Sequence, residues 1–324
     1  MARRSAIGAA VLVLAFACTA CTAGSAGSSG SAGGHPPGPA SQGNAGPGVI
    51  TVGSFDFPES VLLAYLYAGA LSARGYPVRV LPDLGSRELV EPALMTGLVQ
   101  LVPEYTGSAL GFVSLGRAHA TADVTATAAA LANAMAARGI VTARSAEAQD
   151  ANAIVVTRAT ASRYRLRTIS DLARAAPGLV FGGPPECPER PDCLPGLRRT
   201  YGLRFRAFAA LDAGGPLTRQ ALEAGDIGAA LLFTTDPAIK ARHLVELADN
   251  RHLQPAENVI PVLRRATADR YGPGLLAALD ATSARLSTDA LTALDAQVEL
   301  DGRDPRAVAR RWLREQGLLR AGAS

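Results

Sequence analysis

The sequence predicts an α/β protein that folds as two lobes with a ligand cleft between them. After residue 48, short β-rich runs alternate with segments of helical pattern, which is typical of mostly parallel sheets flanked by helices. The alternation fills blocks of about a hundred residues, a usual domain size, and helical segments return at the C-terminus. We therefore expect lobe I to comprise residues 49–148 and 257–324, and lobe II to comprise residues 149–256.

The elements of lobe I follow from apolar runs and from end signals. Pro58 and Glu59 suit a first helical turn, because proline is tolerated there and a carboxylate favours the positive end of the helix dipole. Gly75 stops this helix. The runs predict strands over 49–55, 76–82, 98–105, 139–143 and 259–264, and helices over 58–71, 86–97, 122–138, 274–286, 288–297 and 305–317.

Lobe II shows the same alternation between its two crossings near residues 148 and 256. The runs predict strands over 153–157, 178–181, 205–211, 227–233 and 243–247, and helices over 168–176, 194–202 and 217–225. Ligands of open α/β sheets bind beyond the carboxyl ends of the strands, so we expect the binding site in the cleft between the lobes. Hinge closure is the usual motion of such a clamp.

Residues 1–21 have the layout of a secretory signal, with a short basic segment, an apolar run over 7–17 and then small residues with cysteines. Cys21 fits the lipidated cysteine of a lipobox somewhat better than Cys18 does, and simple secretion with cleavage nearby is the alternative. Residues 22–48 are mostly Gly, Ser, Ala and Pro, which predicts a disordered tether. Because no later apolar stretch is long enough to span a bilayer, we expect an extracytoplasmic protein anchored to the outer face of the cell membrane by lipid alone.

Composition and motifs argue against several classes of function. The formal net charge is +4 and the basic residues are scattered and nearly all arginine, so no basic stripe marks a nucleic-acid interface. His119, His243 and His252 are isolated and lack the spacing of metal ligands. No nucleophile elbow, P-loop or dinucleotide-binding motif occurs. We expect no catalysis, no metal and no cofactor, and an exported enzyme on the same fold is the alternative.

The stretch CPERPDC over 187–193 predicts a disulfide between Cys187 and Cys193, because paired cysteines of an exported protein are normally oxidised. Prolines inside the ring fix the backbone, so Arg190 is held in one orientation. A guanidinium offers a fork of donors that suits a carboxylate. The alternative is a surface loop that the disulfide protects only against proteolysis.

Seven motifs resemble those of one family in their order and spacing. They are ITVGSFDFPES, LGSRELVEPALMTGLVQLVPEYTGSAL, TISDLA, LPGLRRTYGL, LLFTTDPAIKARHLVEL, NVIPVLR and DPRAVARRWLREQGLL. They resemble the substrate-binding proteins of osmoprotectant ABC importers, which take up glycine betaine, choline, carnitine and related quaternary amines. The resemblance covers Val49 to Leu319. It implies a type II periplasmic-binding fold, a lipoprotein, and a permease and its ATPase as partners of what we expect to be a monomer.

The resemblance also implies ligand contacts at particular positions. Tyr105 stands where the family has a tyrosine of an aromatic cage around a trimethylammonium head, and Phe233 stands at another aromatic position. Ser108 and Arg190 correspond to residues that hold the carboxylate of the ligand. Here the disulfide is expected to brace an anion-binding arginine.

Other family positions differ in this sequence. Ala153 and Glu257 replace cage aromatics, and Phe55 replaces a lysine that neutralises a carboxylate in some members. We interpret Phe55 as a new wall and Glu257 as an attraction for a cation; a pocket rebuilt for a different small molecule is the alternative. Asp56 and Thr234 are further candidate contacts, and helix capping is the competing explanation for both.

Overall fold

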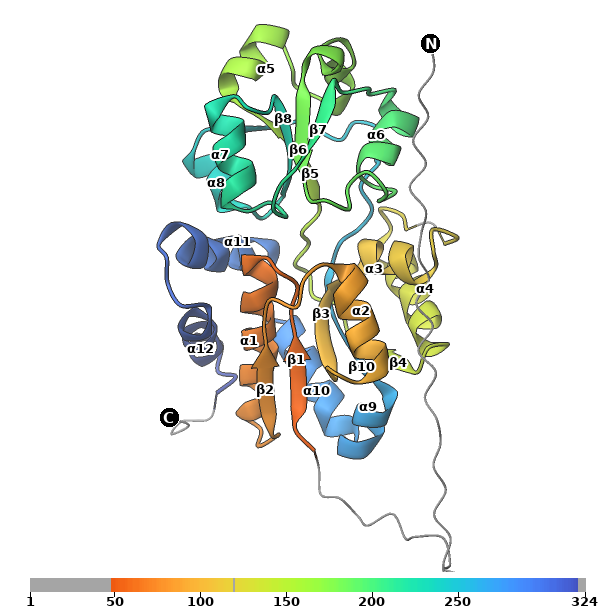
Figure 1. Ribbon diagram of the computed structural model, residues 1–324. Coiled ribbons are helices and arrows are strands. Elements are labelled where there is room, and N and C mark those ends of the chain that lie inside the picture. The colour runs from red at the N-terminus through yellow and green to blue at the C-terminus, as the bar shows by residue number, and fades with distance from the viewer. Residues whose placement is uncertain (1–47, 119, 320–324) are drawn as a thin grey trace, which may run out of the picture. The chain divides into compact units, whose positions relative to one another are not determined.

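The computed structural model describes residues 48–118 and 120–319. The expected signal peptide with Cys21 and the expected tether up to residue 47 lie outside these residues, as does His119. The described chain forms two five-stranded sheets with helices packed around each (Figure 1). Among the described residues, no helix is both long enough and apolar enough to cross a membrane.

The first sheet has the strand order β2-β1-β3-β10-β4. Its strands are β1 (Ile50–Gly53), β2 (Val78–Leu81), β3 (Leu101–Tyr105), β4 (Ile140–Thr142) and β10 (Val259–Arg264). β1 pairs in parallel with β2 and β3, and β10 runs antiparallel to both β3 and β4. The four strands other than β10 therefore point the same way, and β1 and β3 are buried along their whole length.

The second sheet repeats this arrangement in the order β7-β6-β8-β5-β9. Its strands are β5 (Asn152–Val156), β6 (Val180–Gly183), β7 (Ala207–Ala210), β8 (Ala229–Phe233) and β9 (Val245–Glu246). β6 pairs in parallel with β7 and β8, whereas β5 runs antiparallel to β8 and β9. Both sheets are thus mixed, with one strand reversed in each.

The reversed strand of each sheet is the one that arrives from the other sheet. The chain passes from β4 to β5 and returns from β9 to β10 (Figure 1). These two connections pair with each other, because Gln149 and Asn258 form an antiparallel bridge and the amide of Asp150 donates to the carbonyl of Glu257 at 3.0 Å. The expected two-lobed α/β architecture is confirmed.

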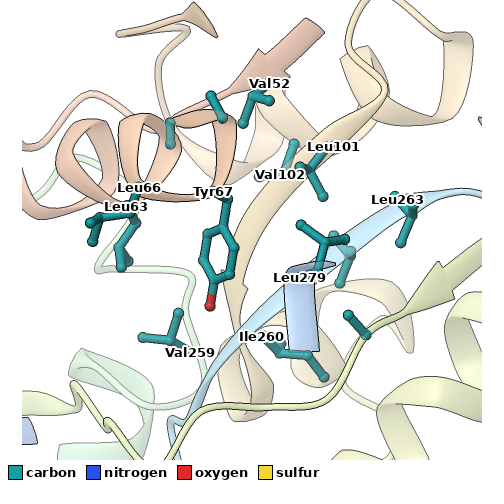
Figure 2. Close-up of a cluster of buried hydrophobic side chains, with 14 of the residues drawn as sticks. Val52, Leu63, Leu66, Tyr67, Leu101, Val102, Val259, Ile260, Leu263 and Leu279 are labelled. Carbon is teal, nitrogen blue, oxygen red and sulfur yellow. The ribbon is translucent and has the colours of Figure 1, made fainter. Parts of the chain in front are cut away.

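Eight α-helices surround the first sheet in the described residues. They are α1 (Pro58–Ser72), α2 (Arg87–Thr96), α3 (Thr106–Val113), α4 (Val124–Ala136), α9 (Arg265–Tyr271), α10 (Pro273–Ser283), α11 (Thr288–Asp295) and α12 (Pro305–Glu315). Leu63, Leu66 and Tyr67 of α1 face the strands in the core (Figure 2). The buried hydroxyl of Tyr67 is hydrogen-bonded to Ser283 Oγ of α10 at 3.0 Å, so it keeps a polar partner inside the core.

The helices around the second sheet depart from prediction in several segments: those over 158–164 and 237–241 were not among the predicted ranges, and the one over 168–176 takes another form. They are α5 (Arg158–Tyr164), α6 (Leu194–Tyr201), α7 (Pro216–Ala224) and α8 (Pro237–Ala241). The helix expected over 168–176 is instead a 3₁₀ turn, Ile169–Arg174, followed by a second one, Ala176–Gly178. Asp171 and Thr168 form a capping box at the start, and Pro177 prevents a regular α-helix from continuing.

Around the first sheet, the helix expected over 288–297 ends as α-helix at Asp295 and continues as a π-helix, Ala296–Leu300.

Candidate functional site

A cavity of about 660 Å³ lies between the two sheets. Its walls come from the carboxyl ends of strands in both sheets, where Phe55 follows β1, Tyr105 ends β3, Pro184 follows β6, Leu211 follows β7 and Phe233 ends β8. This is where an open α/β sheet binds its ligands. The volume suits a small-molecule ligand.

Three aromatic rings from both sheets gather around Phe57 in one wall of the cavity. Its ring centroid lies 5.8 Å from that of Phe55, 6.1 Å from that of Tyr105 and 5.3 Å from that of Phe233. All four side chains line the cavity, and we call them the aromatic cluster. Phe57 was not among the predicted contacts. The pattern Phe-x-Phe directly after a buried strand was the available signal, because alternate residues there share a face.

Carboxylates outnumber cations among the lining residues by eight to two. The acidic side chains are Asp56, Glu88, Asp150, Glu186, Glu189, Asp192, Asp212 and Glu257, and the basic ones are Arg87 and Arg190. Burial holds the pKa of Asp150 well above its usual range, but even with Asp150 neutral the acidic lining groups exceed the two arginines, so the site favours cations over anions.

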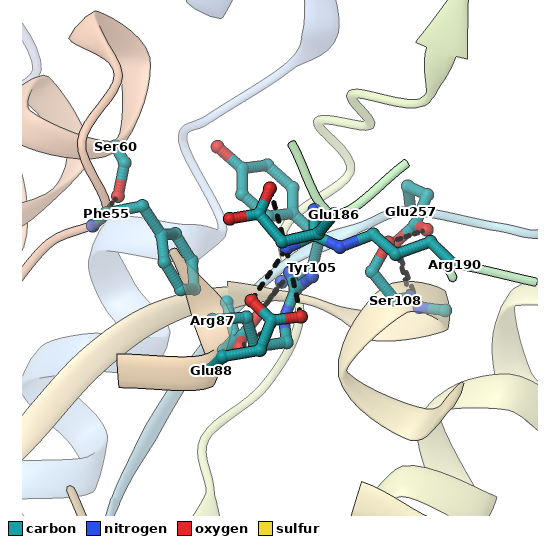
Figure 3. A network of polar contacts seen from close by, with 11 residues as sticks. Phe55, Ser60, Arg87, Glu88, Tyr105, Ser108, Glu186, Arg190 and Glu257 are labelled. Carbon is teal, nitrogen blue, oxygen red and sulfur yellow. Dashed lines mark hydrogen bonds and ion pairs between the residues drawn. The ribbon is translucent and has the colours of Figure 1, made fainter. Parts of the chain in front are cut away.

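Arg87 of α2 is already neutralised inside the protein. Its guanidinium donates two hydrogen bonds to the carboxylate of Glu104, at 2.8 and 2.9 Å, and both side chains are buried. It also lies 5.0 Å above the centre of the Phe55 ring (Figure 3). Arg87 thus packs against the aromatic cluster through its contact with the Phe55 ring.

Arg190 lies in the expected disulfide ring and lines the cavity. Cys187 and Cys193 are bonded to each other, with their Cα atoms 5.3 Å apart, and both are buried. The Arg190 guanidinium donates to the carboxylate of Glu88 at 3.1 Å and lies 4.0 Å from that of Glu186 (Figure 3). The guanidinium therefore joins the second lobe to α2 of the first.

Ser108 and Glu257 contact each other at the start of α3. The Glu257 carboxylate accepts hydrogen bonds from the amides of Gly107 and Ser108, both at 3.0 Å, and from Ser108 Oγ at 2.6 Å (Figure 3). Burial raises the pKa of Glu257 to about 7, although the hydrogen bonds from Ser108 and the charge of Arg87 oppose this rise. Both residues line the cavity.

Behind the aromatic cluster lies a group of buried carboxyl side chains, whose grouping the sequence did not predict. Glu59 accepts a hydrogen bond from the Tyr105 hydroxyl at 2.5 Å and another from the Thr235 hydroxyl at 2.6 Å. Burial raises the pKa of Glu59, Asp150 and Asp295, and their proximity raises that of Asp150 and Asp295 further. Within the described residues, no group of three or more His, Cys, Asp or Glu side chains is arranged to hold a metal ion.

The remaining predicted contacts lie in different surroundings. Asp56 is exposed at the cavity wall. Thr234 is not among the residues that line the cavity; its hydroxyl donates to Asp150 Oδ1 at 3.3 Å and accepts from the Ala151 amide. Ala153 is buried in the second sheet, and its neighbour Asn152 lines the cavity.

The fold and the chain both match known transport proteins. Residues 48–315 match the family described as the substrate-binding domain of an ABC-type glycine betaine transport system. A glycine-betaine-binding protein of Pseudomonas aeruginosa is 30% identical over 284 residues, which are 84% of this chain and 89% of that protein. The glycine betaine-binding protein YehZ of Escherichia coli K12 is 26% identical over 83% of this chain and 90% of that protein. An ergothioneine transport permease/ergothioneine binding protein of Helicobacter pylori is 29% identical over 51% of this chain and 29% of that protein.

Solved structures show the same fold. A glycine betaine/carnitine/choline ABC transporter structure superposes with a TM-score of 0.66 at 23% identity and covers 83% of this chain and 99% of that one. Lactococcal OpuAC, in its closed form with glycine betaine, superposes with a TM-score of 0.59 at 12% identity over 83% and 96% of the two chains. The chain therefore belongs to the family of substrate-binding domains of ABC-type glycine betaine transport systems.

Proposed function

We propose that this protein captures a small quaternary amine in the cavity between its lobes and delivers it to a membrane permease that an ATPase drives. The observation that carries the ligand class is the aromatic cluster in an acidic cavity. Each aromatic face attracts a desolvated cation by about 0.5–2 kcal/mol. A quaternary ammonium has no hydrogen-bond donors, so aromatic faces and distant carboxylates suit it better than close polar contacts do.

Both lobes contribute to this site. Phe55, Phe57 and Tyr105 belong to the part assigned to lobe I, 49–148 with 257–324, and Phe233 belongs to the part assigned to lobe II, 149–256. A ligand held by rings from both parts favours an arrangement in which the lobes are closed on it.

Anchoring and delivery complete the proposal. A lipid on Cys21, followed by the tether over 22–48, would hold the binding domain at the outer face of the membrane. The Helicobacter pylori relative is named as an ergothioneine transport permease joined to a binding protein, which supports a permease as the partner.

The test uses choline and its neutral carbon isostere, 3,3-dimethyl-1-butanol, with the mature protein in a titration calorimeter. Both molecules have the same shape, so their difference in affinity reports the positive charge alone. We expect saturable binding of choline and at least about tenfold weaker binding of the alcohol, which corresponds to about 1.4 kcal/mol. Equal affinities, or no binding of choline, would refute the proposed ligand class.

A further inference from the structure

The positive end of α3 faces the cavity, but the protein itself occupies its hydrogen-bond donors. The amide of Thr106 donates to the carbonyl of Asn258 at 3.1 Å. The amides of Gly107 and Ser108 and the Ser108 hydroxyl all donate to Glu257, at 3.0, 3.0 and 2.6 Å. A helix N-terminus normally offers such groups to an anion. Here the bound anion is a side chain of the same chain.

Glu257 is held firmly in this position. Only 3% of the residue is exposed, and its carboxylate receives three hydrogen bonds from one helix start. The backbone of Glu257 lies in the connection between the lobes, and its carbonyl accepts a hydrogen bond from the Asp150 amide at 3.0 Å. Displacing the carboxylate would leave buried donors unpaired, which is costly.

Neither arginine that lines the cavity is free to bind a negative group of a ligand. Both lining arginines are engaged with carboxylates, Arg87 with Glu104 and Arg190 with Glu88 and Glu186. Asp192 and Glu257 line the cavity as well, and the charge of Asp192 raises the pKa of Glu257, so the two carboxylates influence each other. An additional carboxylate on a ligand would enter a site whose acidic side chains outnumber its arginines by eight to two, with both arginines already paired.

We propose that Glu257, bound to the start of α3, makes this cavity select cations without a carboxylate over zwitterions with the same ammonium head. The inference rests on the function proposed above for the ligand class. It assigns Glu257 as a specificity-determining residue, because the carboxylate excludes a ligand's negative end while it attracts the positive one.

Choline and glycine betaine form the test pair, because they share the trimethylammonium head and differ in an alcohol against a carboxylate. Calorimetry at pH 8, above the pKa of about 7 that burial gives Glu257, compares wild type with Glu257→Gln. A glutamine can still accept from both α3 amides and donate to Ser108 Oγ, so the local fold is kept.

We expect wild type to bind choline at least about tenfold more tightly than glycine betaine, and Glu257→Gln to bring the two affinities to within about threefold. Glu315→Gln removes the same charge from an exposed position of α12 outside the cavity lining, so it is expected to leave the ratio as in wild type. Wild type that binds glycine betaine as tightly as choline, or a ratio that Glu257→Gln leaves unchanged, would overturn the inference.

A second measurement needs no quaternary amine. Acetate is titrated into wild type and Glu257→Ala while the amide resonances of Gly107 and Ser108 are followed by NMR. We expect saturable shifts in Glu257→Ala, where the α3 donors are vacant, and none in wild type. Saturable shifts in wild type, or none in Glu257→Ala, would overturn the inference. If neither choline nor glycine betaine binds, the proposed ligand class fails, and the acetate titration still decides the role of Glu257.

Discussion

Replacing Phe57 with leucine tests the aromatic cluster at its centre. Phe55, Tyr105 and Phe233 all lie with ring centroids 5.3 to 6.1 Å from that of Phe57. Leucine keeps an apolar side chain at the position and removes the ring quadrupole. Loss of one cation–π contact of about 0.5–2 kcal/mol predicts choline binding that is about 2- to 30-fold weaker. Each lost aromatic pair also contributes about 0.5–1.5 kcal/mol to stability, so we expect a lower melting temperature.

The assay compares choline with 3,3-dimethyl-1-butanol in the same calorimeter. Phe57→Leu should weaken the binding of choline by about 2- to 30-fold and change the affinity of the neutral alcohol far less. Tyr164→Leu, which removes a partly exposed ring of α5 outside the cavity lining, should leave both affinities as in wild type. Equal losses for choline and the alcohol would show that the cavity recognises apolar shape, and would refute the cation–π argument.

Two further predictions concern stability. The double variant Cys187→Ser/Cys193→Ser should lose about 2 kcal/mol of unfolding free energy in urea, because the disulfide closes a short loop. Wild type treated with a reductant should show the same loss of stability. A double variant as stable as wild type would contradict the loop-closure argument. Asp295→Asn should be more stable than wild type at alkaline pH. Burial, together with the nearby carboxyl groups of Glu59, Glu299 and Asp150, holds the pKa of Asp295 well above its usual range. The folded state therefore binds more protons than the unfolded state, and the stability of wild type falls as pH rises through that pKa. Urea unfolding at several pH values should give a flatter profile for Asp295→Asn, and an unchanged slope would exclude this carboxyl as the cause.

Much of the fold was predictable because its elements have strong local signals. The strand over 259–264 was predicted with the bounds that β10 has, and α1 was predicted to within one residue at its end. The helix α3 was missed, because TGSALGFV contains two glycines and a serine and resembles a loop. It forms because the donors at its start are satisfied from Glu257 and Asn258, which lie about 150 residues away in the sequence.

The site was less predictable for the same reason. Tyr105 and Phe233 end strands, and strand ends are visible in the sequence. The partner of Arg190 is not visible, because Glu88 is separated from it by 102 residues and belongs to the other lobe. Glu59 looked like an ordinary charge at a helix start, and its contacts with Tyr105 and Thr235 exist only in the folded chain.

The paired connections between the lobes determine which contacts survive when the lobes rotate. We expect two neighbouring backbone segments, which the bridge between Gln149 and Asn258 joins, to act as one hinge axis, with atoms moving in proportion to their distance from it. Arg190 reaches across to Glu88 from a loop outside these segments, so rotation pulls this ion pair apart. Glu257 lies in one of these segments, so we expect its hydrogen bonds to α3 to be kept as the lobes rotate. The barrier that we propose against the negative end of a ligand would then be present in the open form as well as in the closed one.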